Sequence, residues 1–174
     1  MVSLKELLGS PVILLALSAE EYYQNAYKTA RELQDVYGSL CYVSIEKPAC
    51  DVAAELKAAG LRANTLFVAG PAALAEKRRK TPEIKCSECG LAIVDLTVGI
   101  FGLIDRYHPA AVVIEPIAAI AKHNPEMEAA KFIHYLANDS RTHKRALVLI
   151  CKKSELKTKF VKDVMLFVDK VVSD

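Results

Sequence analysis

Residues 11–27, PVILLALSAEEYYQNAY, decide the fold class of this protein. Residues 12–17 form a continuous apolar run, which is typical of a β-strand that is covered on both faces of its sheet. From Glu20 onward, apolar residues recur at helical spacing, and Gly38 can end that helix. A buried strand followed directly by an amphipathic helix predicts parallel strands that are joined by helices.

The same alternation continues along the whole chain of 174 residues. Further strands are expected at residues 39–46, 64–70, 110–115 and 145–151, with a short sixth strand at 170–172. Helices are expected at residues 20–37, 51–60, 91–107, 126–138 and 156–167. Residues 70–89 are polar, basic and interrupted by a proline, which indicates an exposed, irregular excursion. The pattern predicts one α/β domain over residues 1–174, with three layers and a mostly parallel sheet that has helices on both faces.

Composition and charge exclude several classes of protein. Apolar residues make up 52% of the chain, too many for a disordered protein. The net charge of +2 argues against nucleic-acid binding, which needs a concentrated basic face. The longest nearly uncharged run, residues 91–104, is shorter than a membrane span. The first residues do not resemble a signal peptide, and the five cysteines are odd in number, so we expect a cytoplasmic protein without disulfides.

The turn after the first strand carries an unusual charge. In many α/β proteins this turn holds a phosphate, and ligands generally bind at the carboxyl ends of the strands. Here the turn is Ser18-Ala19-Glu20-Glu21, without glycine or lysine. A helix N-terminus attracts an anion, which Glu20 and Glu21 can supply from the chain itself while they repel a triphosphate. A site that binds phosphate in some other way remains an alternative.

The order of motifs resembles the RecA-like ATPases of the KaiC type. LCYVSIEKPACDVAAELKAAGL, residues 40–61, resembles the second strand and helix of that family. RYHPAAVVIEPIAAI, residues 106–120, resembles its Walker B strand. RALVLICKKSEL and LFVDKVV resemble the following strand and the closing strand. The resemblance extends over nearly the whole chain and implies a RecA-like core.

The departures from this family lie where its activity resides. The P-loop pattern G-x-x-x-x-G-K-[ST] is missing, and Lys28 lies too far along the helix to replace its lysine. The family's catalytic acidic pair becomes Glu46-Lys47, and the position of its magnesium-orienting aspartate becomes Glu115. The resemblance therefore implies a non-catalytic domain, without a cofactor, whose remnant positions are Glu46 and Glu115. An ATPase with a rebuilt phosphate site, in which these two carboxylates hold magnesium, is an alternative.

What the resemblance implies is a regulatory or scaffolding role through protein contacts, with itself or with an intact ATPase relative. A run of apolar residues over residues 91–104 goes nearly all the way round its helix, so we predict that a second subunit covers it. The homodimer or larger assembly would have Phe101 near the interface. Alternatively, the basic loop at residues 76–85 folds back over the helix. We expect Tyr23 and Tyr27 in the core and Tyr22 on the surface.

Cys86-Ser87-Glu88-Cys89 supplies a different hypothesis. A C-x-x-C sequence can be a redox pair or half of a metal site, so a thiol- or metal-based enzyme or sensor is a second reading of the chain. The remaining candidate ligands are scattered, and a pair without chemistry in a surface loop is the simpler interpretation. The basic run at residues 77–80 has no nearby aromatic residue to stack on a base, which favours a solvated loop.

Overall fold

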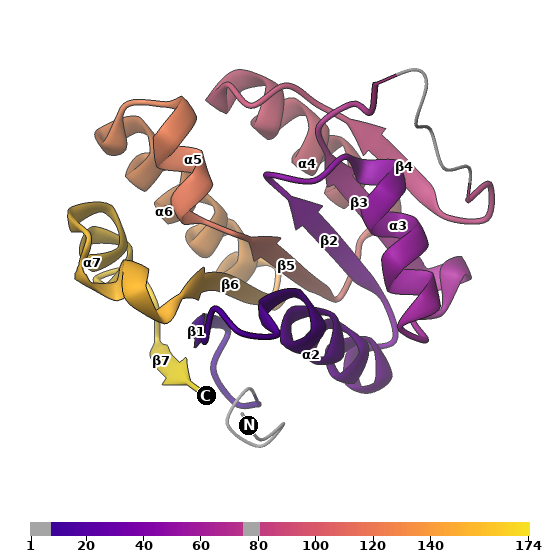
Figure 1. Ribbon diagram of the computed structural model, residues 1–174, viewed down its shortest axis with the longest axis horizontal. Coiled ribbons are helices and arrows are strands. Elements are labelled where there is room, and N and C mark those ends of the chain that lie inside the picture. The colour runs from indigo at the N-terminus through magenta and orange to yellow at the C-terminus, as the bar shows by residue number, and fades with distance from the viewer. Residues whose placement is uncertain (1–7, 75–80) are drawn as a thin grey trace.

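The computed structural model describes residues 8–74 and 81–174, and its centre is one parallel β-sheet (Figure 1). The sheet has seven strands in the order β4-β3-β2-β5-β6-β1-β7. Every strand pairing in it is parallel. The strands are β1 (Val12–Leu17), β2 (Leu40–Ser44), β3 (Leu66–Gly70), β4 (Lys85–Glu88), β5 (Ala111–Glu115), β6 (Ala146–Lys152) and β7 (Lys170–Ser173). The expected α/β class and parallel sheet are therefore confirmed.

The helices form two layers, one on each face of the sheet (Figure 1). From β1 the chain moves outward through β2 and β3 to β4, and it then returns through β5 and β6 to β7. Because crossovers between parallel strands are right-handed, reversing this direction moves the connecting helices to the opposite face. One layer holds α2 (Tyr22–Tyr37) and α3 (Ala49–Ala58); the other holds α4 (Ile93–Tyr107), α5 (Ala118–His123), α6 (Glu126–Thr142) and α7 (Lys159–Met165).

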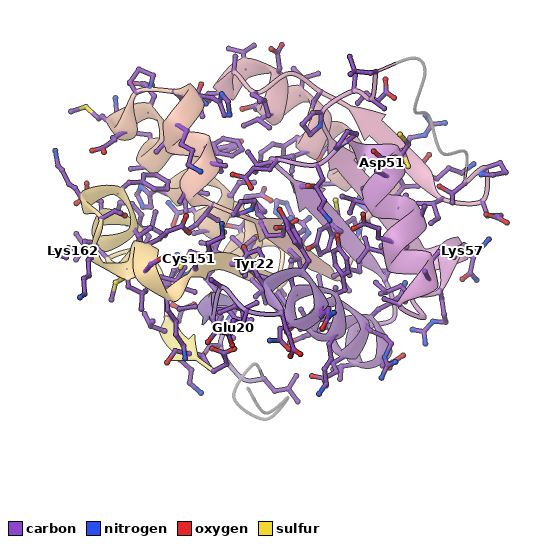
Figure 2. The ribbon with its side chains drawn as sticks, viewed as in Figure 1. Glu20, Tyr22, Asp51, Lys57, Cys151 and Lys162 are labelled. Carbon is purple, nitrogen blue, oxygen red and sulfur yellow. The ribbon has the colours of Figure 1, made fainter. Side chains whose placement is uncertain are left out.

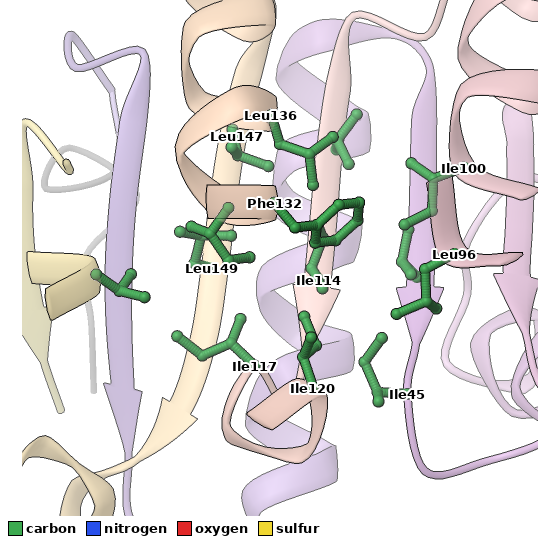
Figure 3. Close-up of a cluster of buried hydrophobic side chains, with 14 of the residues drawn as sticks. Ile45, Leu96, Ile100, Ile114, Ile117, Ile120, Phe132, Leu136, Leu147 and Leu149 are labelled. Atoms are coloured by element: carbon green, nitrogen blue, oxygen red, sulfur yellow. The ribbon is translucent and has the colours of Figure 1, made fainter. Parts of the chain in front are cut away.

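Two hydrophobic clusters, one on each face of the sheet, form the core. Alternate residues of β1 belong to different clusters: Ile13 and Leu15 pack with α2 and α3, and Val12 and Leu14 pack with the other layer. The continuous apolar run in β1 thus follows from burial on both faces. Figure 3 shows part of the cluster on the face that holds α4, α5, α6 and α7, in which Phe132 of α6 lies over β5.

Strand β4 was not expected from the sequence. Its residues are polar and mostly exposed, because β4 is an edge strand that pairs only with β3 among the described strands. Such a strand lacks the apolar run that identifies a buried one. Two short 3₁₀ helices, η1 (Ala63–Thr65) and η3 (Lys153–Lys157), complete the connections.

Helix boundaries also differ from the expected ones. The expected last helix is divided into η3 and α7, and α6 continues four residues beyond the expected end at Asn138 to Thr142. Met127, in the first turn of α6, is 70% exposed. Within the two described ranges, no helix has both the length and the apolar content needed to cross a bilayer.

Candidate functional site

The candidate site lies at the carboxyl ends of the central strands. The chain leaves β1 and β2 toward α2 and α3 on one face, and it leaves β5 and β6 toward the opposite face. Such a divergence opens a crevice in which α/β proteins place their ligands. The residues that follow these four strands therefore define the site.

Glu115, the last residue of β5, is the most deeply buried carboxyl group of the site. It pairs in register with Ser44 of β2 and is 0% exposed. Neither of its carboxyl oxygens has a hydrogen-bond partner among the described residues. Burial raises the pKa of Glu115 from 4.5 to about 7, although nearby Tyr42, Lys47 and Ser44 each lower it. This side chain is thus covered from ligands at the surface, although its carboxyl oxygens could still accept hydrogen bonds.

Four of the chain's seven tyrosines gather around this carboxyl group. The ring centroids of Tyr22 and Tyr23 are 5.2 Å apart, those of Tyr23 and Tyr27 are 6.1 Å apart, and those of Tyr27 and Tyr42 are 5.9 Å apart. Burial raises the pKa of each of these four phenols, and the charge of Glu115 raises it further, which places Glu115 near them all. Aromatic rings therefore close the site on the side of α2.

Tyr22 corrects an expectation, because it is 4% exposed rather than a surface residue. It lies near Cys151 at the end of β6 (Figure 2). The hydroxyl group of Tyr22 is buried and has no hydrogen-bond partner within the described part of the chain. The hydroxyl group of Tyr42 is also buried and approaches the Glu115 carboxyl without forming a hydrogen bond of good geometry.

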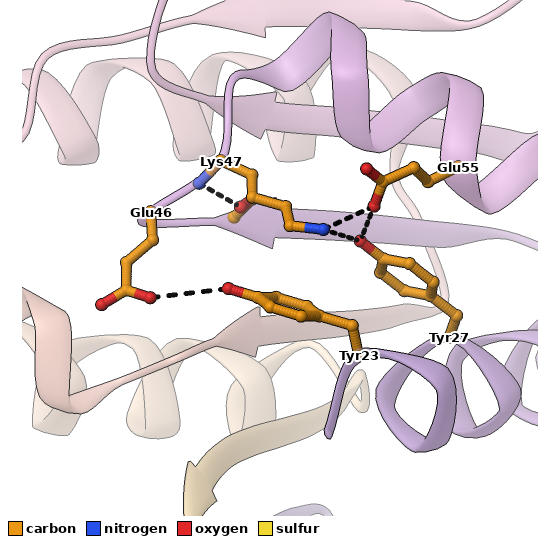
Figure 4. A network of polar contacts seen from close by, with 6 residues as sticks. Tyr23, Tyr27, Glu46, Lys47 and Glu55 are labelled. Atoms are coloured by element: carbon orange, nitrogen blue, oxygen red, sulfur yellow. Dashed lines mark hydrogen bonds and ion pairs between the residues drawn. The ribbon is translucent and has the colours of Figure 1, made fainter. Parts of the chain in front are cut away.

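Lys47, on the loop between β2 and α3, extends its side chain across the mouth of this site (Figure 4). Its ammonium nitrogen lies 2.7 Å from Glu55 Oε2 and 3.3 Å from the Tyr27 hydroxyl oxygen. It also lies 3.8 Å from the centroid of the Tyr23 ring. The Tyr27 hydroxyl donates a short hydrogen bond to Glu55. A cation from the chain itself is therefore held between two rings and a carboxylate.

Glu46 lies at the same edge of the sheet as Glu115 but is engaged at the surface. Its carboxylate accepts a hydrogen bond from the Tyr23 hydroxyl at 3.5 Å and pairs with Lys122 at 3.2 Å. The structure thus brings the two expected remnant positions near one another, with Glu115 covered and Glu46 at the rim.

The turn after β1 binds a carboxylate, but not the one that the sequence suggested. The backbone N–H of Ser18 donates to Asp174 Oδ1 at 3.1 Å, and its hydroxyl lies 3.0 Å from the same oxygen. Lys153 Nζ lies 2.9 Å from this oxygen as well. Glu20 and Glu21 are exposed and precede the first turn of α2, and Glu21 makes no capping bond through its side chain. Asp174, rather than Glu20 or Glu21, therefore supplies the carboxylate that binds this turn.

The two cysteines of the C-x-x-C sequence lie on opposite faces of the sheet. Cys86 in β4 pairs in register with Val68, which belongs to the core cluster of α2 and α3. Cys89 packs against the opposite cluster, beside Gly99 of α4. Burial raises the pKa of Cys86 to about 11. In the residues that the structure describes, no three His, Cys, Asp or Glu side chains are grouped so that they could hold a metal ion.

Sequence reasoning had marked Glu46 and Glu115 but missed the residues that cover them. Lys47 was noted only as a departure from the acidic pair of the RecA-like family, and Tyr42 and Asp174 were not singled out. The sequence feature that could have indicated these residues was the group of tyrosines at the start of α2 together with Tyr42 in the next strand. The basic run at residues 77–80 lies outside the described residues, within the segment 75–80.

The comparisons with known proteins agree with the fold and add no family. No known protein-family profile matches this sequence. No curated protein matches it either. Among solved structures, a KaiC-like protein from the hyperthermophilic archaeon Pyrococcus horikoshii OT3 is similar, with a TM-score of 0.65 and 13% sequence identity. The alignment covers 94% of this chain and 71% of that one. At this identity the likeness shows a shared fold.

Proposed function

We propose that this protein is a non-catalytic, RecA/KaiC-like domain that acts in regulation or scaffolding through protein contacts. Its strand ends do not serve an ATPase reaction in this proposal, and the chain assembles with itself, as a homodimer or larger, or with an intact ATPase relative.

The observation that carries the proposal is the occupation of the β1 turn by Asp174. A phosphate at this turn would need the Ser18 N–H and hydroxyl as donors, and both already face the Asp174 carboxylate. The negative charges of Glu20 and Glu21 beside the turn also repel a triphosphate. The Glu115 carboxyl, which magnesium would have to reach, is 0% exposed. These features oppose phosphate and magnesium binding in the same place.

The contact surface of the proposal is the outer face of α4 and α6. Val94 and Val98, one turn apart on α4, are 72% and 70% exposed. Phe101 follows one turn later and packs against Tyr135 of α6, with ring centroids 5.3 Å apart. Exposed apolar side chains that adjoin on neighbouring helices are typical of surfaces that bind another protein. Phe101 lies at the inner margin of this surface, which we call the α4–α6 face.

The alternative cover for the α4–α6 face was the basic loop before β4. The described end of that loop points elsewhere, because Ile84 is buried in the core cluster of α2 and α3. Glu83 also pairs with Lys57 of α3, with an N–O distance of 2.8 Å. Residues 81–84 thus lie on the face of the sheet opposite α4, which favours a second subunit as the cover.

A thermal-shift measurement with ATP and magnesium tests the function. A ligand that binds only the folded state stabilises it by RT ln(1 + [L]/Kd), so a site with micromolar affinity would give a plain shift at millimolar ATP. We expect the melting temperature to stay the same as with magnesium alone. Asp174→Ala is the informative second variant, because it frees the donors of Ser18. A rise in the wild type would contradict the proposal and favour the ATPase with a rebuilt phosphate site. A rise confined to Asp174→Ala would instead show that Asp174 blocks the donors of Ser18 in the wild type.

A further inference from the structure

The surroundings of Lys47 have the composition of an ammonium-binding site. Its nitrogen lies 3.8 Å from the centroid of the Tyr23 ring and 5.7 Å from that of the Tyr27 ring. Glu55 Oε2, at 2.7 Å, supplies the opposite charge. We call these three side chains, Tyr23, Tyr27 and Glu55, the tyrosine cage (Figure 4).

Each wall of the tyrosine cage selects for a cation. The face of an aromatic ring carries negative charge and attracts ammonium groups within about 6 Å, including alkylated ones that donate no hydrogen bond. Glu55 neutralises the charge of the occupant. An anion would be repelled by Glu55 and by Glu46 at the rim, and a neutral group would gain no cation–π attraction. The chemistry of the cage thus specifies an organic cation.

The polar capacity around the cage exceeds what Lys47 uses. Behind it lies Glu115, which is 0% exposed and whose two carboxyl oxygens have no hydrogen-bond partner in residues 8–74 or 81–174. The buried hydroxyl group of Tyr22 is equally without a described partner, whereas that of Tyr42 approaches the Glu115 carboxyl. Buried polar groups are rarely left unpaired, and such exceptions call for an explanation.

Lys47 can leave the cage without a change of fold. Its backbone N–H is anchored to the Ser44 hydroxyl at 3.1 Å, so only its flexible four-carbon side chain needs to move. That side chain is 29% exposed, which gives it a route to solvent. The cage therefore has an entrance, and the lysine lies across it.

We propose that the tyrosine cage is a binding site for alkylammonium groups and that Lys47 is its built-in competing occupant. A free ligand with an alkylammonium head binds when the Lys47 side chain swings out. This proposal does not depend on the absence of nucleotide binding, because the cage recognises a cation, whereas a phosphate at the Ser18 turn would be an anion.

Tethering makes the lysine a strong competitor. An occupant attached to the same chain has a high effective concentration, and a ligand's apparent affinity falls in proportion to the fraction of molecules whose site is vacant. The wild-type protein should consequently bind free alkylammonium weakly. Lys47→Ala empties the cage, and the affinity for choline should increase by roughly tenfold or more.

Proton NMR titration of choline tests the proposal directly. In Lys47→Ala, the N-methyl signal of choline should move upfield as it enters the space over the tyrosine rings, and 3,3-dimethylbutan-1-ol, its neutral isostere, should not compete. Adding Tyr23→Leu to Lys47→Ala should abolish the shift. Lys57→Ala is the matched control. It also removes a lysine of the same region, one that pairs with Glu83, and no aromatic ring is described against that pair.

A second measurement uses the wild-type protein and does not depend on the stability of any Lys47 variant. The ε-methylene protons of Lys47 should be shifted upfield by the Tyr23 ring, and addition of choline should move them toward the values of a free lysine. The proposal is overturned if Lys47→Ala binds choline no better than wild type. It is equally overturned if the neutral isostere binds as well, or if the Lys47 protons resonate at free-lysine values.

Discussion

The ammonium nitrogen of Lys47 lies 3.8 Å from the centroid of the Tyr23 ring. This contact joins the loop after β2 to the first turn of α2, on the face of the sheet that holds Glu115. The positive charge of Lys47 lowers the pKa of Glu115, but burial raises it by more. Burial thus outweighs the lowering effects of Tyr42 and Lys47 on the pKa of this carboxyl group.

Glu115 should make the stability of the protein depend on pH. Its pKa is raised from 4.5 to about 7 in the folded state, so the folded chain holds this proton more tightly than the unfolded chain. The stability from this group is complete below pH 4.5 and is lost as the pH rises through about 7. Glu115→Gln should remove about 3 kcal/mol of that change in unfolding free energy.

Urea denaturation at about pH 5 and about pH 8 measures this change. Glu20→Gln is the control, because Glu20 is exposed and lies outside the helix. An equal loss of stability with rising pH in wild type and Glu115→Gln would show that Glu115 does not carry the effect.

Two glycines of α4 should respond to alanine in opposite directions. A Cβ at Gly99 would lie 2.7 Å from Cys89 Cβ, so the chain before the helix would have to move. A Cβ at Gly102 would meet nothing within 4 Å. Gly102→Ala should stabilise the protein by about 1 kcal/mol through helix propensity, while Gly99→Ala should destabilise it by about 1–3 kcal/mol through overpacking.

Thermal or urea unfolding of both variants tests the pair. Adding Cys89→Gly to Gly99→Ala should recover part of the loss, because it removes the atom in the way. If both alanine variants stabilise the protein equally, the close approach of α4 to Cys89 is not present in solution.

The α4–α6 face should control the oligomeric state. Val98 is 70% exposed, so Val98→Asp should leave the fold intact while it places a charge in the proposed interface. Light scattering over a range of concentrations should show a dimer or larger assembly for the wild type and a smaller mass for the variant. Val36→Asp is the control, because Val36 is 45% exposed on α2, on the opposite face.

Phe101→Asp should also disrupt the assembly, but Phe101 packs on Tyr135, so its effect on stability must be measured separately. A wild type that remains a monomer at high concentration, with Val98→Asp of unchanged mass, would refute the interface.

Mild oxidation should not link Cys86 to Cys89. The two side chains lie on opposite faces of the sheet, and the raised pKa of Cys86, about 11, leaves little reactive thiolate at neutral pH. Peptide mapping by mass spectrometry after treatment of the native protein with diamide is the measurement. Recovery of a peptide with a Cys86–Cys89 disulfide would require β4 to differ from this structure and would revive the thiol hypothesis.

The elements that sequence analysis identified share one property. β1 and β5 are continuous apolar runs, and α2 repeats its apolar residues at helical spacing, so local pattern alone identifies them. Strand β4 was not identified because an exposed edge strand has no such pattern. Glu46 and Glu115 were marked through the resemblance to RecA-like ATPases, which places them at the ends of two recognisable strands, where α/β proteins bind their ligands.

The sequence by itself determined where the buried strands and the long helices form, because burial on one or two faces imposes a period that can be read locally. Only the tertiary structure decided what meets at the strand ends. Ser18 and Asp174 are 156 positions apart, and they touch because β7 pairs with β1. Lys47 reaches Tyr23 and Tyr27 because α2 and α3 lie on one face of the sheet. The order of strands in the sheet makes these contacts, and no local period encodes that order.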